Sequence, residues 1–154
     1  MEGISTAFLR IDGTIRAFLK RWSLPVLRWS LGIVFVWFGA LKIFGVTPVT
    51  DLVADTVYWF DPDWVVPALG VFEVLVGVGL VTGLAPRIVL GLLVLQLAGT
   101  FLVFVVQPDV AFEDGNPLLL TVEGEFVAKN LVLIAAAFVI GSTIDRAPRP
   151  MTRA

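Results

Sequence analysis

Four long hydrophobic runs organise the chain. They are separated by short polar segments and cover residues 24–45, 65–84, 88–107 and 126–144. A helix needs about 20 mainly apolar residues to cross about 30 Å of hydrocarbon, and each run is close to that length. None of the runs shows the strict alternation of apolar and polar residues that is typical of a barrel strand. The pattern therefore predicts an all-α membrane protein, built as a bundle of four transmembrane helices.

The segment before the first run predicts an amphipathic helix. Its apolar residues recur at helical spacing with basic residues largely between them, and they are Ile4, Phe8, Ile11, Ile15, Phe18 and Trp22. Such a helix lies on an anionic membrane surface, and the alternative is a partner-binding or partly disordered arm. We expect an arm at 1–23, a transmembrane domain at 24–145 and a basic tail at 146–154. A second short interfacial helix is expected in the loop after the first run, where Tyr58 and Trp59 suit a headgroup belt.

Lys and Arg residues predict the orientation. They occur in the N-terminal segment, in the turn at Arg87 and in the C-terminal tail, whereas loops 46–64 and 108–125 contain only acidic charges. Basic residues concentrate in the short loops on the cytoplasmic side of a membrane. We therefore expect both termini in the cytoplasm and loops 46–64 and 108–125 outside it.

Composition limits the chemistry. The chain is 58% hydrophobic, well above the 45–50% that is usual for soluble domains, and its formal net charge is −2. It has no Cys and no His, so neither a thiolate nor an imidazole of this chain can act as nucleophile, base or metal ligand. Electrons of any redox reaction must therefore reside on a bound organic molecule or on a partner. We expect no metal and no covalent cofactor, and the acidic loops predict no nucleic-acid site.

Away from the predicted cytoplasmic edge, three charged residues fall within the predicted spans: Lys42, Glu73 and Lys129. An ionisable group at membrane depth costs several kcal/mol unless it is paired or hydrated, so each is a candidate site residue. All three lie in the outer half of the bilayer by residue count, and an inward-reaching Lys can meet Glu73. The neighbours expected to complete a polar cluster or ligand site are Asn130, Gln96 and Trp37, with Phe35 and Phe38 as further ring walls.

Structural interpretations of the same residues remain open. Lys42 and Lys129 are close enough to the surface to extend to lipid headgroups, in which case they are anchors. Glu73 is too deep for that, so it is either paired or protonated, and a Glu–Lys brace between helices is an alternative to a ligand site. Gly70 and Gly77, on the same helical face as Glu73, predict close approach of a neighbouring helix there.

The order of these motifs resembles the DoxX-like membrane proteins, in particular the YkgB-type branch. The similar segments are Arg28-x-x-Leu31-Gly32-Ile33-Val34-Phe35-x-Trp37-Phe38-Gly39-x-x-Lys42-x-Phe44, Gly70-x-x-Glu73-x-x-x-Gly77, and Gly124-x-Phe126-x-x-Lys129-Asn130-Leu131. The resemblance covers residues 28–144. It implies a four-helix protein of the bacterial plasma (inner) membrane, related to a subunit of a thiosulfate:quinone oxidoreductase. It also implies that Lys42, Glu73, Lys129 and Asn130 face a quinone or another lipophilic ligand.

Three functions follow as hypotheses. The first is a quinone- or lipid-binding component or accessory subunit of a membrane redox complex. The second is a non-enzymatic structural or assembly subunit of a larger membrane complex, in which the charges brace helices. The third is a small transporter, which would need an oligomer because four helices enclose little volume. The expected partners are membrane lipids and other membrane subunits or further copies of this chain.

Overall fold

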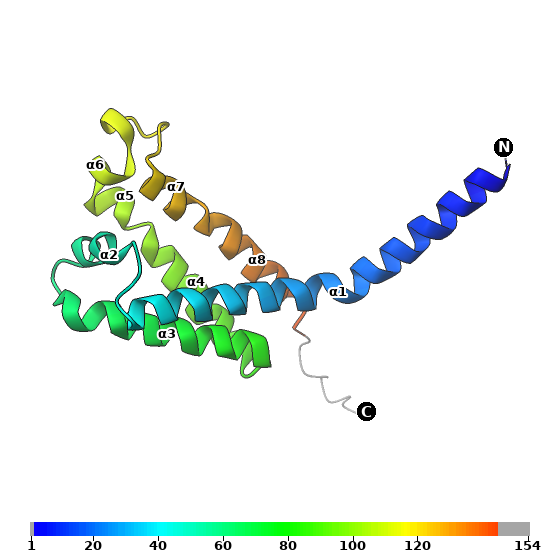
Figure 1. Ribbon diagram of the computed structural model, residues 1–154, viewed down its shortest axis with the longest axis horizontal. Coiled ribbons are helices and arrows are strands. Elements are labelled where there is room, and N and C mark those ends of the chain that lie inside the picture. Colours follow the sequence, from blue (N-terminus) through cyan, green and yellow to red (C-terminus); the bar gives the residue numbers. More distant parts are fainter. Residues whose placement is uncertain (1, 145–154) are drawn as a thin grey trace, which may run out of the picture. The chain divides into compact units, whose positions relative to one another are not determined.

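The structure is a computed structural model that describes the backbone of residues 2–144 and the side chains of residues 11–144, so the predicted basic tail at 146–154 lies outside the described residues. The described backbone is mainly helical (Figure 1). Its helices are α1 (Glu2–Ile43), α2 (Thr50–Thr56), α3 (Pro62–Thr82), α4 (Pro86–Thr100), α5 (Val103–Val106), α6 (Pro108–Ala111), the 3-10 turn η1 (Glu113–Gly115), α7 (Val122–Ala128) and α8 (Asn130–Ser142). Between residues 2 and 144 there is no β-strand, only an isolated bridge between Phe112 and Leu120.

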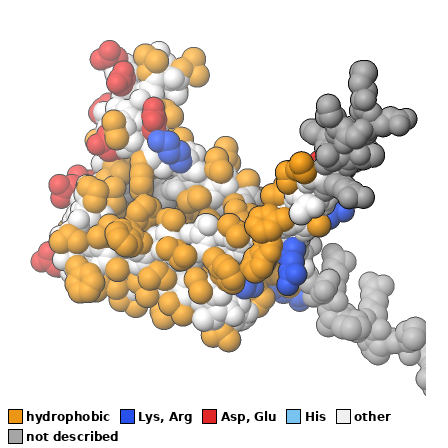
Figure 2. Space-filling model, turned by 45° about the vertical axis from the view of Figure 1, so that its right-hand side comes forward, with side chains coloured by type: hydrophobic (Ala, Val, Ile, Leu, Met, Phe, Trp, Pro, Cys, Tyr) orange, Lys and Arg blue, Asp and Glu red, His pale blue; other side chains and the backbone are white. Residues whose placement is uncertain are grey.

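Four helical segments are long and apolar enough to cross a membrane. They are Ile11–Ile43, Pro62–Thr82, Pro86–Val106 and Val122–Ser142. Large hydrophobic side chains remain exposed along them and cover most of the face seen in Figure 2, as expected where lipid is the solvent. The predicted all-α class with four transmembrane helices is confirmed. The chain divides into an N-terminal unit, residues 1–84, and a C-terminal unit, residues 85–154, which are described separately below.

Helix α1 is longer than the first hydrophobic run. The predicted arm and the predicted first span form one helix of 42 residues, about 63 Å long at 1.5 Å per residue. Pro25 lies inside it and removes the hydrogen bond that its N–H would give to the carbonyl of Arg21, which is the usual cause of a bend. Figure 1 shows α1 unbroken but bent in its N-terminal half. The helical spacing of the arm was predicted, but its continuity with the span was not.

Glycines set the packing of α1 against α3. The two helices run antiparallel, so that Gly32 lies against Gly77 and Gly39 lies against Gly70. A Cβ placed on any of the four glycines would come within 2.8 Å of the carbonyl oxygen of the glycine opposite. Because both helices carry their glycines seven residues apart, about two turns, the two contacts fall on one continuous seam.

The ends of α3 carry standard helix signals. Asp61 is the N-cap, and its side chain accepts a hydrogen bond of 2.9 Å from the N–H of Asp63, with Pro62 in the first helical position. Gly83 ends the helix in the left-handed conformation (φ 75°), which favours glycine. The guanidinium of Arg28 packs against Gly83, so a cation of α1 lies beside the carboxyl end of α3, where the helix dipole is negative. The short helix predicted in loop 46–64 is present as α2.

In the C-terminal unit, α4 packs against α8. Each predicted span of this unit is interrupted: α4 ends at Thr100 before α5 begins at Val103, and α7 ends at Ala128 before α8 begins at Asn130. Gly124 on α7 permits close packing, because a Cβ there would overlap the carbonyl oxygen of Ala111. The carbonyl of Ala111 also accepts a hydrogen bond from the N–H of Thr121 at 3.1 Å, which fixes the loop before α7.

Candidate functional site

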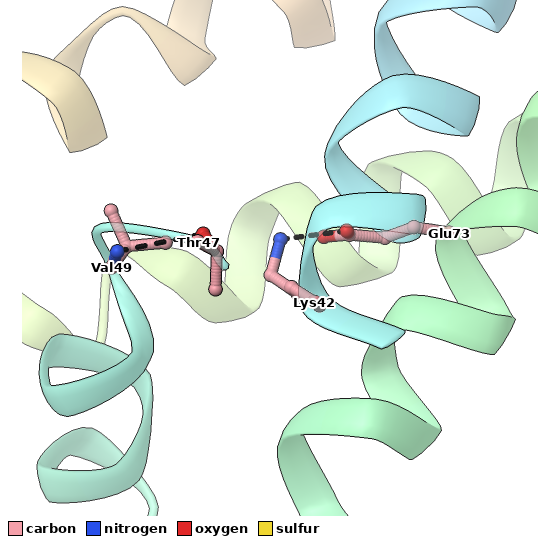
Figure 3. Close-up of polar contacts among 4 residues, drawn as sticks. All are labelled: Lys42, Thr47, Val49 and Glu73. Carbon is pink, nitrogen blue, oxygen red and sulfur yellow. Dashed lines mark hydrogen bonds and ion pairs between the residues drawn. The ribbon is translucent and has the colours of Figure 1, made fainter. Parts of the chain in front are cut away.

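The N-terminal unit contains a buried ion pair. The Nζ atom of Lys42 donates to the Oε2 atom of Glu73 at 2.7 Å, and the two side chains are 8% and 6% exposed. Figure 3 shows the ammonium of Lys42 pointing at the carboxylate of Glu73, beside the loop that carries Thr47 and Val49. The sequence left open whether Lys42 pairs with Glu73 or extends to lipid headgroups. In the structure it pairs with Glu73.

Helix geometry explains why these two residues meet although their Cα positions are not level. Side chains on a helix tilt toward its N-terminus. Lys42, in the last turn of α1, therefore leans back along α1, whereas Glu73 leans toward the start of α3. Because the helices are antiparallel, these two directions converge. The ammonium also lies near the carboxyl end of α1, where the helix dipole favours a cation.

Gly70 makes room for the pair. A Cβ on this residue would lie 2.9 Å from the Cβ of Lys42 and 3.0 Å from the Cγ1 of Ile43, in addition to its contact with the Gly39 carbonyl. The lysine stem therefore crosses α3 at a residue without a side chain. This contact ties the glycine seam to the ion pair, and a change of helix separation at Gly70 would change the reach of Lys42.

The aromatic residues near Lys42 separate into two groups. Phe35 lies seven residues before Lys42, on nearly the same face of α1, and is buried. Trp37 lies about 140° around the helix from Lys42 and is 65% exposed, so it does not wall the pair. Trp37 lines an apolar groove of about 550 Å³ on the other side of α1, together with Ile33, Val36, Ala40, Leu41, Phe44 and Val81. Phe38 is 40% exposed.

Of the two interpretations left open for Lys129, a polar cluster and a surface anchor, its exposure agrees with the surface anchor. Its Nζ atom lies 3.3 Å from the Oε2 atom of Glu125, one turn earlier in the chain, and the two side chains are 72% and 60% exposed. It therefore belongs to an exposed i,i+4 pair and has the exposure of a surface anchor. The signal for this pairing was present in the sequence, since Glu four residues before Lys is the favourable order on a helix.

Asn130 and Gln96 lie in the C-terminal unit. Asn130 is buried, and its Nδ2 atom donates to the Oγ1 atom of Thr100 at 2.8 Å, which joins the start of α8 to the end of α4. Thr100 in turn donates to the carbonyl of Leu97 at 2.6 Å. Gln96 is partly buried on α4, with its Oε1 atom inaccessible to water. Asn130 thus joins two helices of its own unit, and Thr100 is a partner that the sequence did not single out.

The glycines of α1 are the other residues that sequence reasoning missed. Gly32 and Gly39 were noted only within the resemblance, whereas the structure makes them the partners of Gly77 and Gly70. The available signal was the identical spacing of seven residues in both spans. Together the four glycines and the Lys42–Glu73 pair form one seam between α1 and α3, which can hold two opposite charges away from lipid.

Comparison with known proteins identifies the family. The family model described as DoxX matches residues 23–106, more than half of the chain, which include the glycine seam, Lys42 and Glu73. Neither the comparison with curated proteins nor the comparison with solved structures found a match. The match supports the predicted resemblance over residues 23–106, and the fourth transmembrane segment lies beyond the matched residues. On this evidence the chain is a multi-pass membrane protein that belongs to the DoxX family.

Proposed function

We propose that this protein is a component or accessory subunit of a redox complex in a bacterial inner membrane, and that it binds a quinone headgroup, or a lipid of similar polarity, at Lys42. The observation that carries the proposal is the buried ion pair between Lys42 and Glu73. Apolar side chains can often replace a buried ion pair without loss of stability. A pair retained at membrane depth is therefore better explained by a role in binding than by stability alone.

The chemistry of the pair suits a carbonyl ligand. A lysine ammonium has three N–H donors, and one of those of Lys42 is directed at Glu73. A quinone carbonyl oxygen is a suitable acceptor for a second N–H of this ammonium. Electrons would come from a partner, because this chain has no Cys or His to carry them.

Quinone retention tests this function. The protein would be purified from membranes in mild detergent, and its quinone would be extracted and quantified by mass spectrometry. We expect quinone in the wild type and in Glu125→Gln, a control that removes an exposed carboxylate. We expect its loss in Glu73→Gln and in Lys42→Met. The same quinone content in all four proteins would contradict binding at the pair.

A second function is favoured by the glycine seam. The ion pair lies where α1 and α3 approach most closely, and a charged pair at such a contact can brace two helices of a non-enzymatic assembly subunit. In that case Glu73→Gln lowers the stability of the protein, or the amount of a co-purified membrane partner. Quinone content per folded protein would not change. Measuring stability and quinone on the same samples separates the two functions.

A further inference from the structure

Among the described side chains of α1, those of residues 11–23 are exposed, apart from Asp12, which is partly buried. Helix α3, with 21 residues, is about 32 Å long, whereas α1, with 42 residues, is about twice that length. The glycine seam that joins them begins only at Gly32. Hydrocarbon about 30 Å thick cannot contain all of α1, so its N-terminal turns lie at or beyond the membrane surface.

This uncovered part has two chemically different faces. One face carries an apolar stripe at helical spacing, and its side chains are exposed: Ile11, Ile15, Phe18 and Trp22. The remaining face carries Asp12, Arg16 and Lys20, which follow one another at intervals of four residues. Asp12 and Arg16 form an exposed ion pair of 2.8 Å. A helix with such faces leaves its stripe in water if it projects from the membrane, and buries it if it lies along a lipid surface.

The junction between this part and the span repeats a short motif. Arg-Trp-Ser-Leu occurs at 21–24 and again at 28–31, on either side of Pro25. Residues seven apart are about 20° apart around a helix, so Arg21 and Arg28 share one face and Trp22 and Trp29 share the next. Both tryptophans are partly exposed, and the guanidinium of Arg21 lies 5.7 Å from the ring centroid of Trp22. Tryptophan rings beside cations are typical of the headgroup level of a membrane.

We propose that residues 11–29 form an anionic-lipid-binding element: the apolar stripe enters one leaflet, Pro25 bends the helix onto its surface, and the positive charges of Arg16, Lys20 and Arg21 attract anionic lipid headgroups. The charge of this element favours anionic lipid as its ligand. The element has four basic residues and one acidic residue, a net charge of +3, and it continues directly into a transmembrane helix. A membrane surface is therefore always within its reach, unlike a soluble protein partner. This inference is independent of the function proposed for Lys42.

Fluorescence from single cysteines tests the element, since the natural chain has no Cys and needs no background substitution. Phe18→Cys and Lys20→Cys would each be labelled with an environment-sensitive dye and placed in nanodiscs. One set of nanodiscs contains phosphatidylcholine alone, and the other contains phosphatidylcholine and phosphatidylglycerol in equal amounts. In the anionic nanodiscs we expect quenching of the Phe18 label by lipid-borne quenchers and quenching of the Lys20 label by aqueous iodide. In phosphatidylcholine alone, or at high salt, lipid contact of the Phe18 label is expected to fall.

Charge variants give the direction of the effect. Each basic residue near an anionic membrane surface raises the equilibrium constant for binding that surface about fivefold. The double variant Lys20→Gln with Arg21→Gln should therefore lower the partition of the Phe18 label into lipid by about 25-fold. Asp12→Asn should raise the partition of the Phe18 label into lipid, because it removes a negative charge. If the Asp12–Arg16 pair only stabilised the helix, this substitution would not raise the partition. Equal exposure of both labels to water in anionic nanodiscs would overturn the proposal and favour a protein partner. Equal burial of the Phe18 label in both lipid mixtures would overturn the recognition of anionic lipid.

Discussion

Replacing Gly70 by alanine is expected to destabilise the protein, although alanine is the better helix former. The added methyl would lie 2.6 Å from the carbonyl oxygen of Gly39, whereas ordinary contacts begin near 3.4 Å. The helices must therefore separate locally by about 0.8 Å, and overpacking of this kind costs about 1–3 kcal/mol. The gain in helix propensity is at most about 1 kcal/mol. With the full gain in helix propensity, the net loss in the free energy of unfolding is about 0–2 kcal/mol.

Two other glycines provide matched controls. Gly77→Ala meets the Gly32 carbonyl at the same 2.6 Å but does not touch Lys42, so it should cost as much stability as Gly70→Ala and disturb the ion pair less. Gly91→Ala, at a helical position with no atom within 4 Å, should be neutral or stabilising by up to about 1 kcal/mol. Unfolding in mixed micelles of dodecyl maltoside and dodecyl sulfate, followed by tryptophan fluorescence, measures all three. If Gly70→Ala were as stable as Gly91→Ala, the glycine seam would not govern the packing.

Two further predictions concern the C-terminal unit. Asn130→Ala removes the 2.8 Å hydrogen bond to Thr100 from a buried position and should lower the free energy of unfolding by about 1–2 kcal/mol in the same assay, whereas Thr100→Ser keeps the acceptor and should cost less. Lys129→Gln breaks only the exposed pair with Glu125 and should change stability by no more than about 0.5 kcal/mol, and a loss of several kcal/mol would show that Lys129 has a buried partner.

The transmembrane segments could be predicted from the sequence because apolar length is a local property of the chain. The Lys42–Glu73 pairing could be anticipated because charged residues within the spans are few and costly. The partners of Gly70 and Gly77 could not be read from one span, since a close contact depends on two helices matching their spacing. Hydropathy also placed the start of the first span near residue 24, whereas the backbone continues through Pro25 as a single helix. The residues before the span form a helix because of their helix propensity and apolar spacing. Hydropathy detects only the part of the helix that is apolar enough to lie in lipid.

The role of Lys129 shows the limit of arguing from depth. Its distance from the end of the span equals that of Lys42, so residue counting treats the two lysines alike. The difference arises from neighbours: Lys42 crosses a glycine on the adjacent helix, and Lys129 has a carboxylate one turn away on its own helix. Local pairing satisfies Lys129 without burial. Depth therefore identifies candidate residues, and the surrounding side chains decide which of them become buried.

The double replacement Lys42→Met with Glu73→Leu tests the central proposal most directly. It removes both buried charges together and fills their space with apolar side chains, so no unpaired charge remains to unfold the protein. Removal of one partner alone is expected to cost about 3–5 kcal/mol, whereas removal of both should leave stability near that of the wild type. Quinone bound per folded protein is the quantity to measure. We predict a stable double variant that has lost its quinone, and a stable double variant with the quinone content of the wild type would contradict the assignment of the Lys42–Glu73 pair as the ligand site.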